Sequence, residues 1–216
     1  MNTNPSATTI LCYGDSNTWG HNPNKKGRYP ANIRWTGKLQ QTLGDDYYVV
    51  EEGLGSRTTD LEYSKPGRNG KTYLLPCIVS HYPLDIVVMM LGTNDLKTEF
   101  QRDPPTIASA IRGLIQDIKA NAWDENHNTS KIILVSPIVV DDTSVRFEEI
   151  FSHLYDHDSA IKSHELAKVL AAVAAEEGCT FLDASTVAEP GVDGIHFTEE
   201  SHAALATLIA ETIATL

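Results

Sequence analysis

Residues 85–91 read Asp-Ile-Val-Val-Met-Met-Leu, and Gly-Thr-Asn-Asp follows at 92–95. The apolar part of this stretch does not alternate with polar side chains, which is typical of a strand covered on both faces. Residues 132–135, Ile-Ile-Leu-Val, have the same character. These two runs predict a parallel sheet that is covered by helices on both of its faces.

Further strands and helices alternate around these runs. The predicted strands are 9–13, 48–52, 85–91, 131–136 and 180–183. Helical periodicity or capping residues predict helices at 34–43, 72–81, 106–122 and 158–177 and a last helix capped by Thr198. Strand-then-helix repetition indicates an α/β fold with right-handed crossovers. We therefore predict one α/β domain over residues 1–216 with a five-stranded parallel sheet.

The composition argues against nucleic acids and anionic membranes as partners and against a secreted protein. The chain has 216 residues, 41% of them hydrophobic, and a formal net charge of −12. Nucleic acids and anionic membranes attract basic proteins, so we expect neither as a partner. Three cysteines with no close pair predict no disulfide framework. The first nine residues do not resemble a secretory signal, and we expect a cytoplasmic protein.

The first chemical signal is Gly-Asp-Ser at 14–16, directly after the first predicted strand. A serine hydroxyl at the end of a strand is exposed at the sheet edge, where a base can activate it as a nucleophile. The alternative is a turn in which Asp15 or Ser16 only caps a helix.

The second signal is Asp-Gly-Ile-His at 193–196, just before the last predicted helix. A turn at Gly194 would let the Asp193 carboxylate meet the imidazole of His196 and hold its tautomer. The alternative is a polar loop with a helix cap.

Two further motifs follow predicted strands. Asn94, in Gly-Thr-Asn-Asp, can donate its side-chain amide to an oxyanion, although such residues are also common in turns. Gly-Leu-Gly-Ser-Arg-Thr at 53–58 can direct a backbone N–H to the same place. Two long segments, 62–71 and 138–157, leave the same edge of the sheet and are expected to wall a pocket.

These four motifs together resemble the SGNH (GDSL-type) hydrolases. Ser16 matches the serine of the first family block, Asn94 the asparagine of the third, and Asp193 and His196 the Asp-x-x-His pair of the last. The resemblance implies a three-layer α/β/α sandwich of flavodoxin-like type. It also implies Ser16, Asp193 and His196 as catalytic residues.

The second family block departs from the pattern. It usually provides a glycine whose N–H serves the oxyanion hole, but Ser56 occupies that register here and Gly55 lies one residue earlier. The implied oxyanion hole consists of the Ser16 N–H, the Ser56 N–H and the Asn94 side chain, with the choice between Ser56 and Gly55 left open. Asn17, Lys97 and Ile195 are candidate substrate-binding residues beside these motifs.

The chain is most similar to the arylesterase and acyltransferase branch, whose members also make peracids and tend to form oligomers. The stretches that carry this likeness are 10–20, 34–37, 51–54 and 193–199. It implies a serine esterase or acyltransferase for small esters that forms a homo-oligomer. The alternative within the family is a carbohydrate O-acetyl esterase.

We expect no cofactor and no metal. The first strand–helix turn has no G-x-G-x-x-G and no P-loop lysine, which weakens the alternative of a flavin or nucleotide binder without chemistry. His153 and His157 have a spacing that suits a metal, but a solvated or interface surface explains them more simply.

Overall fold

The computed structural model describes residues 2–25, 27–62 and 64–216, and in it five strands form one parallel sheet. Their order is β2-β1-β3-β4-β5. The strands are β1 (Thr8–Gly14), β2 (Tyr47–Gly53), β3 (Ile86–Met90), β4 (Lys131–Ser136) and β5 (Thr180–Asp183). The predicted five-stranded parallel sheet is confirmed, and each predicted strand agrees to within one residue at either end.

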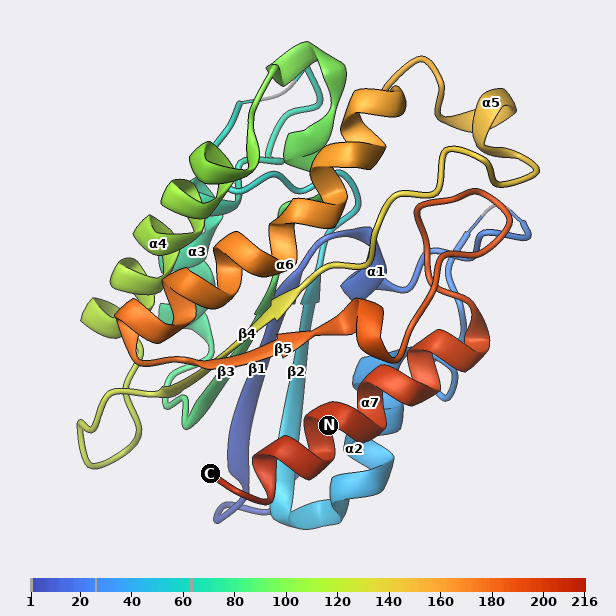
Figure 1. Cartoon of the computed structure of the whole chain (residues 1–216). Helices are drawn as coiled ribbons and strands as arrows, with labels where there is room; N and C mark the ends of the chain where they lie inside the picture. The colour runs from blue at the N-terminus through green and yellow to red at the C-terminus, as the bar shows by residue number, and fades with distance from the viewer. Residues whose placement is uncertain (1, 26, 63) are drawn as a thin grey trace.

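Helices cover both faces of the sheet, as Figure 1 shows. One face carries α3 (Gly70–Ser80), α4 (Pro104–Asn121) and α6 (His157–Glu177), and the other carries α2 (Trp35–Leu43) and α7 (Glu199–Ile213). Successive side chains of a strand point to opposite faces, so Leu11 and Tyr13 join the first apolar cluster and Ile10 and Cys12 the second. The predicted three-layer sandwich is confirmed.

Local sequence signals explain where the long helices begin and end. The Asp156 side chain accepts the Ser159 N–H at the start of α6, and Gly178 ends it in the left-handed conformation. The predicted cap is confirmed at α7, where Thr198 Oγ1 accepts the Ser201 N–H at 3.0 Å.

Two short α-helices of the described residues were not predicted: α1 (Ser16–Trp19) and α5 (Phe147–Ile150). The latter lies within the segment 138–157, which was expected only as a pocket wall. The segment 62–71 is a loop up to the start of α3 in its described part, and Tyr63 lies outside the described residues.

The chain order of the sheet reverses at β1. The first strand lies between β2 and β3, and Gly14 at its end is in register with Gly53 and Met90. The segments after these three residues therefore leave the sheet side by side, together with α1 (Figure 1). In open parallel sheets, ligands bind at such a point beyond the carboxyl ends of the strands.

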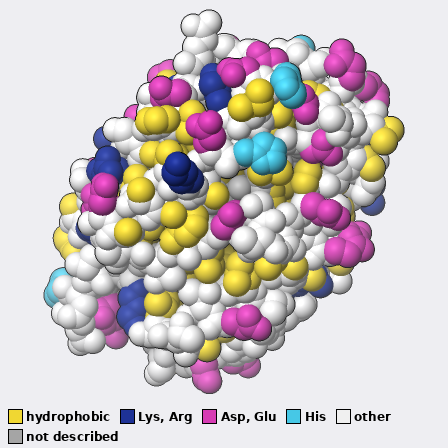
Figure 2. Space-filling view, in the orientation of Figure 1, with side chains coloured by type: hydrophobic (Ala, Val, Ile, Leu, Met, Phe, Trp, Pro, Cys, Tyr) yellow, Lys and Arg dark blue, Asp and Glu magenta, His cyan; other side chains and the backbone are white. Residues whose placement is uncertain are grey.

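The surface agrees with the acidic composition. In Figure 2, Asp and Glu side chains are spread over the visible face and do not form a single patch. Within the described part of the chain, no helix is long and apolar enough to cross a membrane.

Candidate active site

Ser16 is the first residue of α1 and follows Asp15, which caps this helix. Asp15 Oδ1 accepts the Asn17 N–H at 2.9 Å. Burial raises the pKa of Asp15, although this hydrogen bond and nearby positive charges act against the rise. Because Asp15 provides the cap, the Ser16 hydroxyl is not used for it and remains available for other partners.

Ser16, His196 and Asp193 form a continuous chain of hydrogen bonds. His196 Nε2 lies 2.9 Å from Ser16 Oγ, and His196 Nδ1 lies 2.8 Å from Asp193 Oδ2. An ionised carboxylate only accepts hydrogen bonds, so Nδ1 carries the imidazole proton and Nε2 accepts the proton of Ser16. This is the order of contacts that activates a serine nucleophile.

The turn from Asp193 to His196 orients this chain of hydrogen bonds. Asp193 Oδ1 accepts the backbone N–H groups of Ile195 at 3.0 Å and of His196 at 2.9 Å. Burial opposes the charge of Asp193, but the hydrogen bonds and the charge of His196 outweigh it and lower the pKa of the carboxyl. Gly194 has φ of 77°, and a Cβ there would lie 2.2 Å from the Asp141 carbonyl oxygen. Glycine is therefore required at this position both for its conformation and for space.

Asn17 joins the serine turn to the Asp–His turn. Its Nδ2 donates to the Ile195 carbonyl at 3.1 Å, and its Oδ1 accepts the Phe197 N–H at 3.0 Å. Asn17 is buried, with only 1% of its surface exposed, and its two hydrogen bonds fix the turn that carries Ser16 relative to the turn that carries Asp193 and His196. Ile195, also proposed for substrate binding, packs its side chain in the apolar core.

Asn94 lies in the short 3-10 helix Thr93–Leu96, directly after β3. Its Nδ2 lies 3.4 Å from Asp15 Oδ2, and its Oδ1 lies 3.4 Å from the Tyr155 hydroxyl. These long contacts to an acceptor and a donor orient the amide. One N–H of Nδ2 is left to point elsewhere, which suits an oxyanion donor.

Ser56 has φ of 65°, the left-handed region that glycine adopts most easily, whereas Gly55 does not. A left-handed residue at this register explains why the family pattern has glycine there, and it favours Ser56 over Gly55 as the donor. The next residue, Arg57, is 2% exposed, and its Nη1 donates to the Gly14 carbonyl at 2.7 Å. This bond ties the segment that contains Ser56 to the strand end before Ser16.

Two aromatic neighbours of His196 were missed from the sequence. The centroid of the His21 ring lies 4.0 Å from that of His196, and the Phe151 ring lies 5.6 Å away. Burial, together with the charge of His196, lowers the pKa of His21 to about 4, so His21 is neutral at pH 7. His21 directly follows Trp19-Gly20 and so lies close to Ser16 in the sequence. This short separation from the nucleophile was the sequence feature that could have indicated its place in the site. Phe151 comes from the segment 138–157, which thus reaches the site as expected.

Lys97 is buried, with 2% of its surface exposed. Burial lowers its pKa to about 8, and the charge of Lys65 acts in the same direction, while Glu99, Asp15 and Asp95 act against it. With this burial, Lys97 does not face solvent. A role for Lys97 in substrate binding stays a prediction.

Side chains of the types that ligate metals come close together at two places among the described residues: His21 with Asp193 and His196, and Glu52 with Cys77 and His81. The histidines singled out by their spacing lie elsewhere. His153 is exposed, and Nδ1 of the exposed His157 lies 2.7 Å from Asp142 Oδ2.

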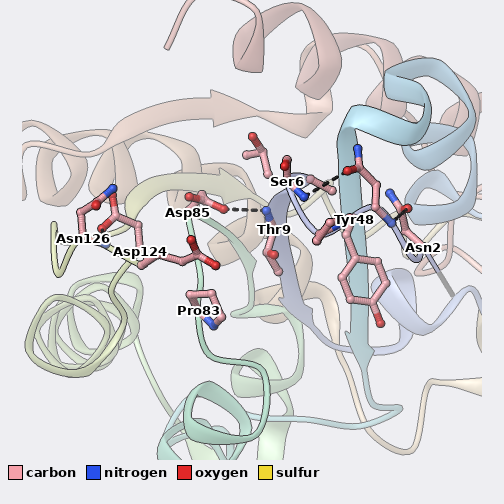
Figure 3. A pocket seen from close by; sticks show the side chains of 13 residues that line it. Asn2, Ser6, Thr9, Tyr48, Pro83, Asp85, Asp124 and Asn126 are labelled. Atoms are coloured by element: carbon pink, nitrogen blue, oxygen red, sulfur yellow. Dashed lines mark hydrogen bonds between the residues drawn. The ribbon is translucent and has the colours of Figure 1, made fainter.

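A surface cavity of about 270 Å³ lies at the opposite end of the sheet (Figure 3). Its walls include Thr9, Tyr48 and Asp85, which lie at the amino ends of β1, β2 and β3, and Asp85 Oδ2 accepts the Thr9 N–H at 2.6 Å. The lining contains none of the residues that surround Ser16, so this cavity is not part of the candidate active site.

Comparisons with known proteins agree with this geometry. Residues 12–204 match the model of the GDSL-like lipase/acylhydrolase family. An aryl esterase of M. smegmatis is 39% identical, with a TM-score of 0.87 over 97% of this chain and 100% of the other. A carbohydrate acetylesterase from Sinorhizobium meliloti is 35% identical, with a TM-score of 0.85 over 96% of this chain and 99% of the other.

A curated relative is more distant. An acetylxylan esterase of Xylanibacter ruminicola is 25% identical over 96% of this chain. The aligned part is 43% of that protein, so the chain spans less than half the length of this relative.

Proposed function

The chain belongs to the GDSL-like lipase/acylhydrolase family and is an enzyme that acts on esters, and from this premise we propose a serine esterase that hydrolyses or transfers short acyl groups through Ser16. The observation that carries the proposal is the hydrogen-bond chain from Ser16 Oγ through His196 to Asp193.

In the first half-reaction, His196 Nε2 takes the Ser16 proton as Oγ attacks the ester carbonyl. The oxyanion is stabilised by the N–H groups of Ser16 and Ser56 and by the Asn94 amide. The imidazolium, stabilised by Asp193, then gives its proton to the departing alcohol, and an acyl group remains on Ser16.

In the second half-reaction, a water molecule attacks the acyl group, His196 takes its proton, and the carboxylic acid leaves. Another alcohol or a peroxide in place of water gives a transferred acyl group or a peracid. The choice between hydrolysis and transfer depends on which nucleophile reaches the acyl-enzyme first.

A small acyl group suits the surroundings of His196. The His21 and Phe151 rings lie close to the imidazole that contacts Ser16, and we expect them to narrow the space for the acyl group. We therefore expect turnover to be highest with acetate or butyrate esters and to fall with longer chains.

A p-nitrophenyl ester series from acetate to octanoate tests this proposal on wild type, Ser16→Ala and Ser6→Ala. Ser6 is an exposed serine at the other end of the sheet and serves as the matched control. We expect turnover to vanish in Ser16→Ala and to be unchanged in Ser6→Ala. Wild-type rates in a folded Ser16→Ala protein would refute the mechanism.

A carbohydrate O-acetyl esterase is the second candidate, supported by the similarity to the Sinorhizobium meliloti and Xylanibacter ruminicola proteins. Both candidates use the same acyl-enzyme and differ in the alcohol that leaves. Acetate release from acetylated xylan, compared with phenyl acetate at equal ester concentration, separates them through the ratio of kcat/KM.

A further inference from the structure

Glu52, Cys77 and His81 gather at the boundary of β2 and α3, and none of them belongs to the Ser16 site. Their potential ligand atoms all lie within 4.8 Å of one another. His81 Nε2 is 2.8 Å from Glu52 Oε1. The Cys77 side chain is buried, whereas the side chains of His81 and Glu52 are 28% and 19% exposed. An ion can therefore reach the cluster from the side of these two residues.

The spacing and the chemistry of the three side chains suit a transition metal. Cys77 lies in the last turn of α3, and His81 is the residue that caps the end of this helix. Their potential ligand atoms lie within 4.8 Å of each other. Glu52 comes from β2, so an ion would link two elements. Thiolate, imidazole and carboxylate are zinc ligands, whereas calcium and magnesium prefer oxygen ligands alone.

We propose that Glu52, Cys77 and His81 bind one divalent ion of the zinc type, with water in the remaining coordination position. On binding, the S–H bond of Cys77 breaks, a sulfur–metal bond forms and the proton passes to solvent. No electron is transferred in this step.

The number of ligands indicates how firmly an ion is held. The cluster offers three protein ligands, whereas structural zinc sites have four. We therefore expect reversible binding rather than a permanently held metal.

The position of the cluster suggests what the ion does. The Glu52 carbonyl accepts a hydrogen bond from Arg57, whose guanidinium also bonds the Gly14 carbonyl. An ion held by Glu52 would stabilise the end of β2, from which the segment with Ser56 departs. It would act through stability and not as a Lewis acid on the ester.

Cobalt(II) provides a direct test because a thiolate–cobalt bond absorbs in the near ultraviolet. The full-length protein, freed of metal with a chelator and kept reduced, is titrated with Co²⁺. We expect a near-ultraviolet band that saturates at about one ion per chain and disappears when zinc is added. Cys77→Ser should lose the band, and Glu52→Gln and His81→Ala should need higher Co²⁺ to reach it.

The controls identify the ligand that produces the band. The group of His21, Asp193 and His196 contains no sulfur and cannot give this absorption. Cys179→Ser, which removes a half-buried cysteine after α6, should keep it. If Cys77→Ser does not fold, the more exposed Glu52→Gln variant still tests the site through its weaker binding. A wild type without a saturable band, or a band that persists in folded Cys77→Ser, would overturn the proposal.

Discussion

Replacement of Asp193 by Asn tests how the structure sets the protonation of His196. In the wild type, Oδ1 accepts two backbone N–H groups and Oδ2 accepts the proton on His196 Nδ1. In Asp193→Asn, the two backbone donors still require an acceptor, so the amide oxygen takes the place of Oδ1. The amide NH₂ must then face Nδ1, which can accept its hydrogen only if the imidazole proton moves to Nε2.

A proton on Nε2 removes the base that Ser16 needs. Loss of the correct tautomer in a serine triad lowers kcat by about 10⁴, which corresponds to about 5 kcal/mol in the activation barrier. We expect a loss of this size in Asp193→Asn with p-nitrophenyl acetate. The thermal unfolding midpoint should change little, because the substitution keeps the size of the side chain and the acceptor for the turn.

Steady-state kinetics across the pH range measures kcat, and thermal unfolding of the same samples measures the unfolding midpoint. Asp193→Glu is a useful companion because it keeps the charge but moves the carboxylate. A folded Asp193→Asn enzyme with kcat within tenfold of wild type would refute the reasoning about the tautomer.

Three further substitutions test the oxyanion donor, a buried histidine and the exposed face of α3. Asn94→Ala should lower kcat by about 10²–10³ with little change in KM, because it removes one oxyanion donor; an unchanged kcat would exclude that role. Burial, with the charge of Arg34, lowers the pKa of His202 to about 3, and its Nδ1 accepts the Trp35 N–H. In the unfolded chain the pKa of His202 is about 6.5, so protonation below that pH favours the unfolded state. The contribution of neutral His202 to the free energy of unfolding is therefore largely present above about pH 6.5 and is smaller by about 2 kcal/mol at pH 5. In urea unfolding, His202→Gln should lose that part of the pH dependence, and an unaltered slope would contradict the assignment. We expect the predicted homo-oligomer to form through the exposed apolar residues of α3, which are Tyr73, Leu75 and Val79. Val79→Glu, at a residue that is 66% exposed, should therefore reduce the molar mass in light scattering, and a wild-type mass would contradict this interface.

The central strands β3 and β4 could be predicted because their sequences are almost uniformly apolar. The side chains of β3 are buried throughout, and its sequence therefore lacks the alternation that a half-exposed strand shows. The short helices α1 and α5 have four residues each, too few to show a helical period.

The motif residues could be placed on one edge because each follows a strand or precedes the last helix. The contacts among them could not be predicted. Tyr155 reaches Asn94 from 61 residues away, and the amide of Asn17 spans to the turn before α7. Such contacts depend on how the segment 138–157 and the two turns fold over the sheet. Short-range sequence patterns do not predict this arrangement.

The choice between Gly55 and Ser56 shows a different limit. Either backbone N–H could serve an oxyanion, and glycine is the residue expected at a left-handed position. The structure places the left-handed conformation at Ser56 and not at Gly55, in the register where the family pattern has glycine.

Mass spectrometry of the enzyme quenched during turnover of p-nitrophenyl acetate tests most directly whether Ser16 is the nucleophile. We expect an acetyl group on the peptide that contains Ser16, present in wild type and absent from Ser16→Ala. An acetyl group on another residue, or full turnover by Ser16→Ala, would contradict this role of Ser16.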